Sequence, residues 1–227
     1  MSPIRAHRLS LLAAIIVLGI VGYGATLPPM HTCGTLPGDY PPVLAFEFAR
    51  SVADLHALFG DAPGDCRTVL VRRMDRLNWG DTAVFIPLYG AFLVFFLLGV
   101  RPHQPRLARV CIVLALLACA ADYAENACLL HLTAQLDRPT VWLASLRWAT
   151  GVKWLLLAVV GVLGGWLVTQ QRQLRLLFGA LCALGLLVVV SALANPYAYG
   201  RHASAGVAVS WALFIFADAF AVARPRA

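Results

Sequence analysis

The chain has 227 residues, of which 60% are hydrophobic and only 13% are charged. Soluble domains carry about 25% charged residues, so this composition excludes an ordinary soluble protein and indicates a polytopic helical membrane protein. The formal net charge of +7 is explained by basic residues that flank membrane spans. We therefore expect the lipid bilayer as a partner and no nucleic acid.

The first apolar run extends from Leu11 to Leu27 and follows a basic start that contains Arg5 and Arg8. A signal peptide and an uncleaved first span both fit this pattern. No Ala-x-Ala cleavage site follows the run, which favours an uncleaved span over residues 1–27. The basic start places the N-terminus in the cytoplasm.

Residues 28–80 form the only sizeable polar segment, and we expect it to be a small α+β region outside the membrane. Alternating apolar side chains predict a short strand over residues 43–49, and Ser51 and Gly60 have the character of a helix start and stop. Residues 66–79 fit either a second strand that turns into a helix or an amphipathic helix that enters the membrane. A segment this short cannot bury a large core of its own, so we expect it to cap the membrane domain.

Two of the six cysteines, Cys33 and Cys66, lie in this outer segment, where an oxidising compartment permits a disulfide between them. The other four lie within apolar runs and suit packing positions. The sequence contains no Cys-x-x-Cys motif and no clustered histidines. We therefore expect no metal site and no cofactor.

Five further apolar runs follow, over residues 81–100, 109–133, 142–168, 174–194 and 206–223. The tails and loops that this division places inside, together with the first two residues of the spans that follow them, hold nine Arg, whereas the two short outer loops hold one each, Arg138 and Arg201. The positive-inside rule then gives six spans with both termini in the cytoplasm of a bacterium, the protein lying in the inner membrane. The predicted fold is a bundle of six transmembrane helices, with residues 81–227 forming a five-helix unit after the outer segment.

The third span carries two carboxyl groups and an amide, at Asp122, Glu125 and Asn126. Residues three and four positions apart lie on one face of a helix, so these side chains form one stripe. Charged groups at membrane depth are costly and normally face a protein interior or a wet cavity. The stripe is therefore the first candidate for a functional site.

The fourth span carries two basic residues, Arg147 and Lys153, that match the stripe in depth. With a helix rise of about 1.5 Å per residue, Lys153 lies about 16 Å from the outer edge and Asp122 about 20 Å from the inner edge. The connection between the two spans is short, so we expect them to be neighbours. Two ion pairs are then predicted, from Lys153 to Asp122 and from Arg147 to Glu125.

Three other residues are secondary candidates. Asp218, in the sixth span, adds a third acid to two bases at similar depth, so one of the three carboxyl groups would have no basic partner and would keep its proton. Asp81 fits either an N-cap of the second span or a pocket residue. Tyr89 follows Pro87, which can kink the span and turn the phenol toward the pocket, although ordinary core packing fits it as well.

The leading functional hypothesis is a buried ionic pocket, open to the outer face, that binds or transports a small polar solute or a lipid headgroup. An embedded enzyme acting on an outer-leaflet lipid is an alternative, with Glu125 or Asp122 as the base and Lys153 or Arg147 stabilising charge. A third hypothesis is a non-catalytic subunit whose outer segment docks a membrane partner protein. The charges would also fit simple structural pairing between helices. Candidate lining residues are Asp122, Glu125, Asn126, Arg147, Lys153, Asp81, Tyr89 and Asp218.

Overall fold

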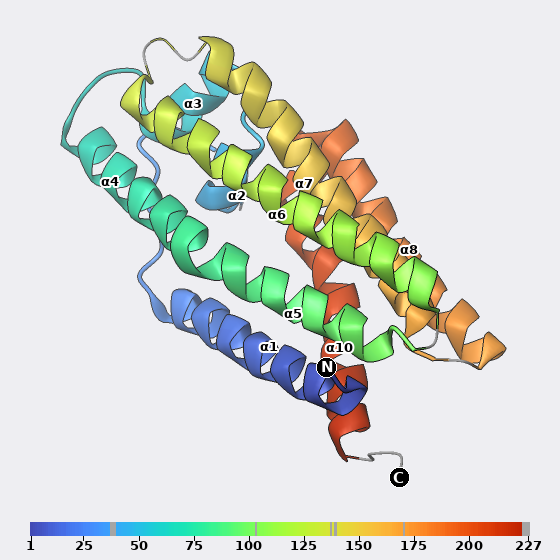
Figure 1. Ribbon diagram of the computed structural model, residues 1–227. Helices are drawn as coiled ribbons and strands as arrows, with labels where there is room; N and C mark the ends of the chain where they lie inside the picture. Colours follow the sequence, from blue (N-terminus) through green and yellow to red (C-terminus); the bar gives the residue numbers. More distant parts are fainter. Residues whose placement is uncertain (37–39, 103, 137, 139, 170, 224–227) are drawn as a thin grey trace.

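The computed structural model describes residues 1–36, 40–102, 104–136, 138, 140–169 and 171–223, and every regular element within these ranges is helical (Figure 1). Six helical segments are long and apolar enough to cross a membrane. The predicted multi-pass helical membrane protein is confirmed at this level. The six segments are α1 (Pro3–Thr26), α4 with α5 (Asp65–Val100), α6 (Pro105–Ala134), α7 (Thr140–Leu167), α8 (Arg172–Ala194) and α10 (Ala203–Ala223), with the short α9 (Pro196–Tyr199) and η2 (Gly200–His202) before α10.

The long helices form a closed ring. Helix α1 packs against α5 and α10, α6 lies between α5 and α7, and α8 lies between α7 and α10. Helix α10 also contacts α7 across the ring. The start of α1 and the end of α10 lie at the same end of the bundle, which we call the terminal end, and the short helices α2 and α3 lie at the other, which we call the cap end (Figure 1).

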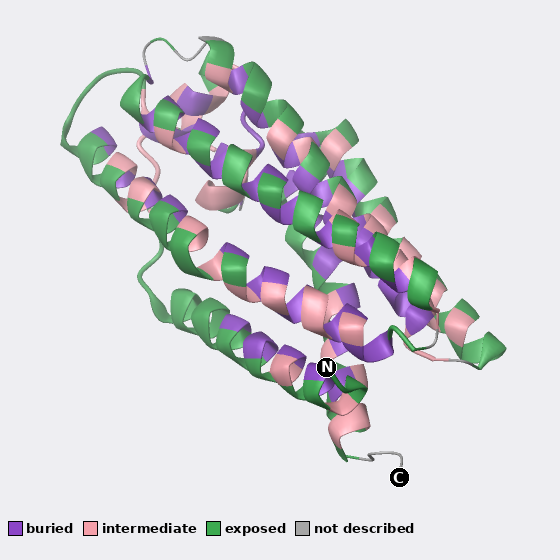
Figure 2. Cartoon of the chain, viewed as in Figure 1, coloured by how far each residue is buried: buried purple, intermediate pink, exposed green. Residues whose placement is uncertain are grey.

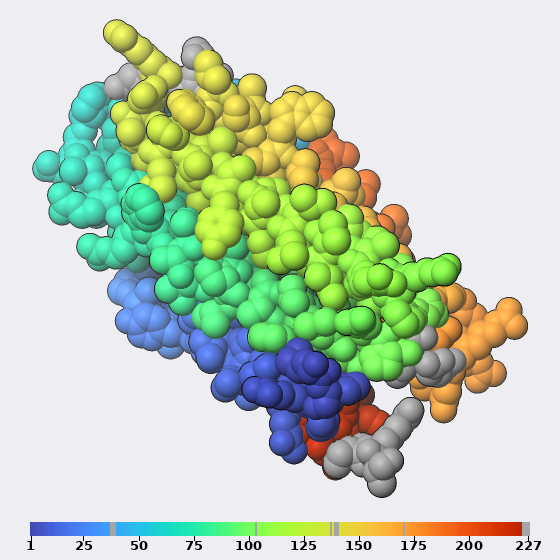
Figure 3. Space-filling view, viewed as in Figure 1, coloured from blue at the N-terminus to red at the C-terminus, as the bar shows by residue number. Residues whose placement is uncertain are grey.

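The surface of the bundle is apolar where lipid would meet it. Large exposed side chains such as Leu116, Leu117 and Leu184 point outward from α6 and α8, and Figure 2 shows the buried residues turned to the interior. Side chains of α1, α5, α6 and α7 close the spaces between the ribbons on the face shown in Figure 3. Apolar side chains therefore cover the outside of the bundle, where lipid would contact it.

The second span is longer than its sequence indicated. Helix α4 (Asp65–Gly80) continues through a π-helical turn, η1 (Asp81–Phe85), into α5 (Ile86–Val100). Pro87 lacks the N–H that would reach the carbonyl of Ala83, so the regular ladder is interrupted beside this wide turn. Asp81 thus lies inside a continuous helix, and its interpretation as an N-cap is wrong.

The cap consists of residues 28–64 and contains two short helices. Helix α2 (Pro42–Glu47) replaces the strand predicted over residues 43–49, and the described residues contain no strand. Pro42 fixes the backbone angle that a first helical turn requires, and this local preference prevails over the alternating pattern. Helix α3 (Val52–Phe59) confirms the second prediction: Ser51 and Asp54 form a capping box, and Gly60 ends the helix with a positive φ of 79°.

The cap is anchored on both sides of the cap end. The predicted disulfide between Cys33 and Cys66 is present and joins the cap to the start of α4. Opposite, Arg50 donates to the Leu193 carbonyl and the Tyr40 hydroxyl donates to the Pro196 carbonyl at 3.1 Å. Buried apolar residues of the cap pack onto the membrane helices, among them Phe46, Leu55, Leu58 and Phe59 against Met74, Leu129 and Leu132.

Burial of Tyr40 and its proximity to Glu47 raise the pKa of the Tyr40 hydroxyl to about 12. The hydroxyl therefore remains a hydrogen-bond donor to Pro196 throughout the physiological pH range. This anchor of the cap is insensitive to ordinary changes in pH.

Helices α8 and α10 approach most closely where two glycines face each other. A Cβ added at Gly206 would lie 2.6 Å from the Gly185 carbonyl oxygen. We expect Gly206→Ala to lower the free energy of unfolding by about 1–3 kcal/mol, because backbones must separate to admit the methyl group. Gly22→Ala, where a Cβ would meet nothing within 4 Å, is the matched control. Thermal unfolding in micelles measures both, and equal melting temperatures would contradict the close packing.

Candidate functional site

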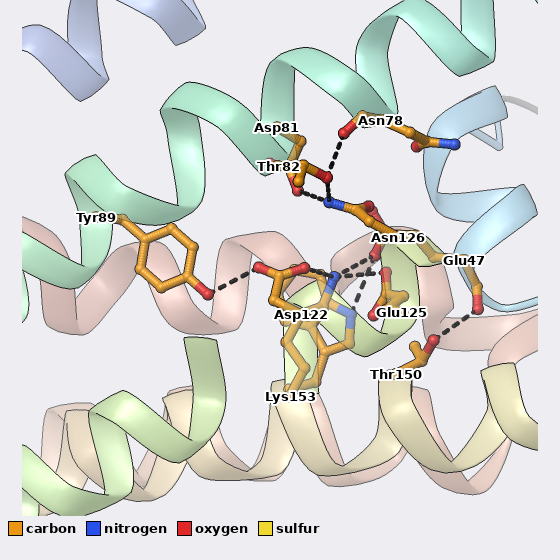
Figure 4. A network of polar contacts seen from close by, with 11 residues as sticks. Glu47, Asn78, Asp81, Thr82, Tyr89, Asp122, Glu125, Asn126, Thr150 and Lys153 are labelled. Atoms are coloured by element: carbon orange, nitrogen blue, oxygen red, sulfur yellow. Dashed lines mark hydrogen bonds and ion pairs between the residues drawn. The ribbon is translucent and has the colours of Figure 1, made fainter. Parts of the chain in front are cut away.

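The Lys153 amine lies among three carboxylates in the cap-end half of the bundle (Figure 4). Its Nζ is 2.7 Å from Glu125 Oε1, 3.1 Å from Glu47 Oε2 and 3.4 Å from Asp122 Oδ1. The structure thus brings together the α6 stripe and Lys153 of α7, as the depth comparison predicted. We call Glu47, Asp81, Asp122, Glu125 and Lys153 the lysine–carboxylate centre.

The α6 stripe connects the centre to the second span. Tyr89 donates from its hydroxyl to Asp122 Oδ2 at 2.8 Å, and Asn126 donates from Nδ2 to Asp81 Oδ2 at 2.6 Å. The Asn126 amide also lies 3.1 Å from Thr82 Oγ1. The π-helical turn carries Asp81 and Thr82, so the irregular part of this span holds the groups that meet α6. Such turns occur frequently at functional sites.

Glu47 comes from the cap and was not among the predicted site residues. Its carboxylate accepts hydrogen bonds from Lys153 and from Trp154 Nε1 at 3.2 Å, and its carbonyl accepts one from the Thr150 hydroxyl at 3.1 Å. Thr150, Lys153 and Trp154 share one face of α7, since they are three and four positions apart. The sequence feature that could have indicated Glu47 is its place between two aromatic residues, Phe46 and Phe48, both of which are buried.

The centre contains more acids than bases. Three carboxylates surround a single ammonium group, and the Asp81 carboxyl group nearby accepts a hydrogen bond from the Asn126 amide. No second basic side chain contacts these four groups in the ion pairs and hydrogen bonds of the described residues. Glu125 is 1% exposed, and its second oxygen, Oε2, is buried without a hydrogen-bond partner. An unpaired buried carboxylate is costly, so some positive charge is expected to neutralise the excess.

Exposure within the centre increases toward the cap. The Glu125 side chain is 1% exposed, those of Asp122 and Lys153 are each 7% exposed, and that of Glu47 is 13% exposed. Glu47 is therefore the most exposed of the three carboxylates around Lys153. The outward opening that the sequence suggested stays a prediction, since the ion pairs close the centre in this conformation.

Arg147 does not join the centre, which corrects the prediction that it pairs with Glu125. Its side chain is exposed on α7, and Lys153 contacts Glu125 instead. Six residues separate Arg147 from Lys153, which turns their side chains roughly 120° apart around the helix. Depth matched for both bases, but only Lys153 has the angular position that faces α6.

Asp218 also lies away from the centre. It pairs with His7 of α1, with 2.7 Å between Asp218 Oδ1 and His7 Nδ1, and it is fully buried. His7 fits against Gly99 of α5, where an added Cβ would lie 2.5 Å from the imidazole ring. The earlier interpretation of Asp218 as a third acid beside the stripe is therefore wrong, because depth along tilted helices does not specify the neighbour.

An aromatic layer separates the two polar groups. Phe96 and Phe214 stack with ring centroids 4.0 Å apart, and Trp211 lies 5.6 Å from Phe92 and 5.7 Å from Tyr89. Tyr89 joins this layer to the centre through its hydrogen bond to Asp122. Aromatic rings thus fill the interior between the lysine–carboxylate centre and the His7–Asp218 pair.

We expect Asp218→Asn to lower the free energy of unfolding by about 1–2 kcal/mol, since a charge-assisted hydrogen bond to His7 becomes a neutral one of roughly half the strength. Chemical unfolding of the protein in micelles measures the loss. Ser145→Ala, at an exposed position of α7, is the control and is expected to change stability by less than about 0.5 kcal/mol. An equal effect of the two substitutions would show that the buried pair contributes nothing.

Among the described residues, no group of three or more His, Cys, Asp or Glu side chains is arranged to hold a metal ion. The centre instead surrounds an ammonium group with carboxylates. Comparisons with models of known protein families, with curated proteins and with solved structures find no significant match. The functional argument therefore rests on the geometry of the centre.

Proposed function

We propose that this membrane protein binds a small positively charged ligand at the lysine–carboxylate centre and transports it. The ligand is either a solute or the cationic headgroup of a lipid. The observation that supports this proposal is the imbalance of charge: three carboxylates share one base, the Asp81 carboxyl group beside them contacts only an amide among the described residues, and Glu125 Oε2 is buried without a partner.

Structural pairing alone explains this imbalance poorly. Buried charges that only join helices are expected to balance, because each unpaired ion loses several kcal/mol of hydration. The His7–Asp218 pair has that form, one base with one acid. At the lysine–carboxylate centre the excess acid needs either protons or a cation. Such an excess at membrane depth is typical of ion and substrate pathways.

The ligand is proposed to enter from the cap end. Glu47 is the most exposed carboxylate around Lys153, and it belongs to a short helix rather than to a membrane span. Displacement of α2 would move the Glu47 carboxylate away from Lys153 without disturbing the packing between α6 and α7. The positive-inside rule places the cap outside the cytoplasm, so uptake from the outer face is the proposed direction of entry.

The test is thermal unfolding of the full chain in nanodiscs with different cations at constant ionic strength. We expect at least one cation to raise the melting temperature saturably, because a ligand at 100 times its dissociation constant adds about 2.7 kcal/mol of stability. Glu125→Gln is expected to abolish the shift. Arg147→Gln, an exposed site on the next helix, should retain it.

Absence of a saturable shift with every cation would refute the proposal, since the carboxyl groups would then carry only protons. Equal shifts in the Glu125→Gln and Arg147→Gln proteins would place cation binding elsewhere. Uptake of the stabilising cation into proteoliposomes then separates transport from binding alone.

A further inference from the structure

The surroundings of Lys153 match an ammonium group in number and kind. An ammonium has three N–H donors, and three carboxylate oxygens lie around Nζ, from Glu125, Glu47 and Asp122. The Trp154 ring adds a fourth contact, with its centroid 4.9 Å from Nζ. Aromatic rings attract cations of this kind. Carboxylates and an aromatic ring together form a cage for a primary ammonium.

We propose that the ligand is a primary ammonium compound whose –NH₃⁺ group replaces the Lys153 amine in this cage. The proposal rests on the cation-binding function above and names its ligand class. When the ligand is absent, the Lys153 amine occupies the ammonium position, and its ion pairs keep the cage closed. The unpartnered Glu125 Oε2 gives the entering ammonium an acceptor that Lys153 does not use.

The cage discriminates between cations by its hydrogen-bond acceptors. A quaternary ammonium carries the same charge but has no N–H donor, so the three carboxylates would lose the hydrogen bonds that a primary ammonium donates to them. A hard metal ion requires at least six oxygen ligands in the case of Ca²⁺ or Mg²⁺. A primary ammonium satisfies the carboxylates with three N–H donors, as Lys153 does.

Replacement of Lys153 is directly measurable, because Lys153 is the only lysine in the chain. Acylating reagents modify the neutral, accessible amine, and the caged side chain is only 7% exposed. The full chain in phosphatidylcholine nanodiscs is treated with an acylating reagent at constant ionic strength, with and without ethylammonium chloride. Peptide mapping by mass spectrometry separates Lys153 from the N-terminal amine.

We expect ethylammonium to increase modification of Lys153 several-fold and to raise the melting temperature, both saturably and at the same concentrations. Tetramethylammonium and sodium are expected to do neither. Arg147→Gln should behave as the wild type, and Glu125→Gln should lose the melting-temperature response to ethylammonium. Lys153→Gln, in which a neutral amide replaces the Lys153 amine, should bind ethylammonium more tightly than the wild type if it folds.

A second arm distinguishes the two sources of a primary ammonium. Nanodiscs that contain phosphatidylethanolamine are compared with pure phosphatidylcholine nanodiscs, without added solute. Increased Lys153 modification in the former identifies a lipid headgroup as the ligand. An increase with ethylammonium only identifies a soluble amine.

Three outcomes would overturn the inference, and they differ in what they leave standing. If sodium stabilises the wild type as well as ethylammonium does, and Glu125→Gln removes both effects, cation binding holds and the ammonium class is wrong. If no cation alters stability or Lys153 modification, the proposed function fails as well. Protection of Lys153 by ethylammonium, rather than exposure, would show that the ligand binds over the cage and does not replace the lysine.

Discussion

Lys153→Ala is expected to lower the free energy of unfolding by about 3–5 kcal/mol, because it removes the only base among the described residues that contacts Glu47, Asp122 and Glu125. The three carboxylates would lose their common partner in surroundings from which water is largely excluded. The measurement is reversible unfolding in mixed micelles, with the yield of membrane-inserted protein as a second readout.

The control for this substitution is Arg147→Ala on the same helix. Arg147 is exposed, so its loss is expected to change stability by less than about 0.5 kcal/mol. The double variant Lys153→Met, Glu125→Gln should recover part of the loss, since the deepest carboxylate no longer carries a charge. If Lys153→Ala were as stable as Arg147→Ala, the centre would be hydrated rather than dry, and the argument from charge imbalance would lose its basis.

The relation between α6 and α7 was predictable because it depends on regular geometry. Helical spacing placed Asp122, Glu125 and Asn126 on one face, and the short connection made the next span a neighbour. Lys153 then met the stripe at matching depth. Depth is only one coordinate, however, and it left the angular position undetermined. Arg147 shows the consequence, since it has the expected depth and points outward.

The contribution of the cap was not predictable from periodicity. Residues 43–49 alternate as a strand would, yet α2 forms there and directs Glu47 toward Lys153. A segment of six helical residues is too short for a period of 3.6 to be distinguished from a period of 2. Pro42 favours the first helical turn, and packing of Phe46 against Phe59 and the membrane helices, which only the folded chain provides, adds to this preference.

The pairing of His7 with Asp218 was missed for a different reason. The two residues are separated by 211 positions and lie on the first and last helices. Sequence gives the depth of each but not that α1 and α10 are adjacent, because ring closure depends on the packing of all six helices. A buried aspartate near the end of the last span needed a partner, and His7 was one of few ionisable residues on the first.

Removing the disulfide with Cys33→Ala, Cys66→Ala is expected to destabilise the cap by about 3–4 kcal/mol, given that the bridge closes a loop with a sequence separation of 33. The bridge touches the bundle only at Cys66, at the start of α4, so the loss is expected as local opening of the cap while the membrane helices remain folded. Limited trypsin digestion measures it, through the rate of cleavage after Arg50, whose side chain holds the cap to α8.

A reductant should bring the wild type to the cleavage rate of the double variant and leave the variant unchanged. Cys182→Ala, a buried free cysteine on α8, is the control and should keep the slow rate. Opening of the cap withdraws Glu47 from Lys153, so acylation of the single lysine should rise together with cleavage after Arg50. If cleavage rises while Lys153 stays unreactive, the cap does not control access to the centre, and entry of the ligand must occur between the membrane helices instead.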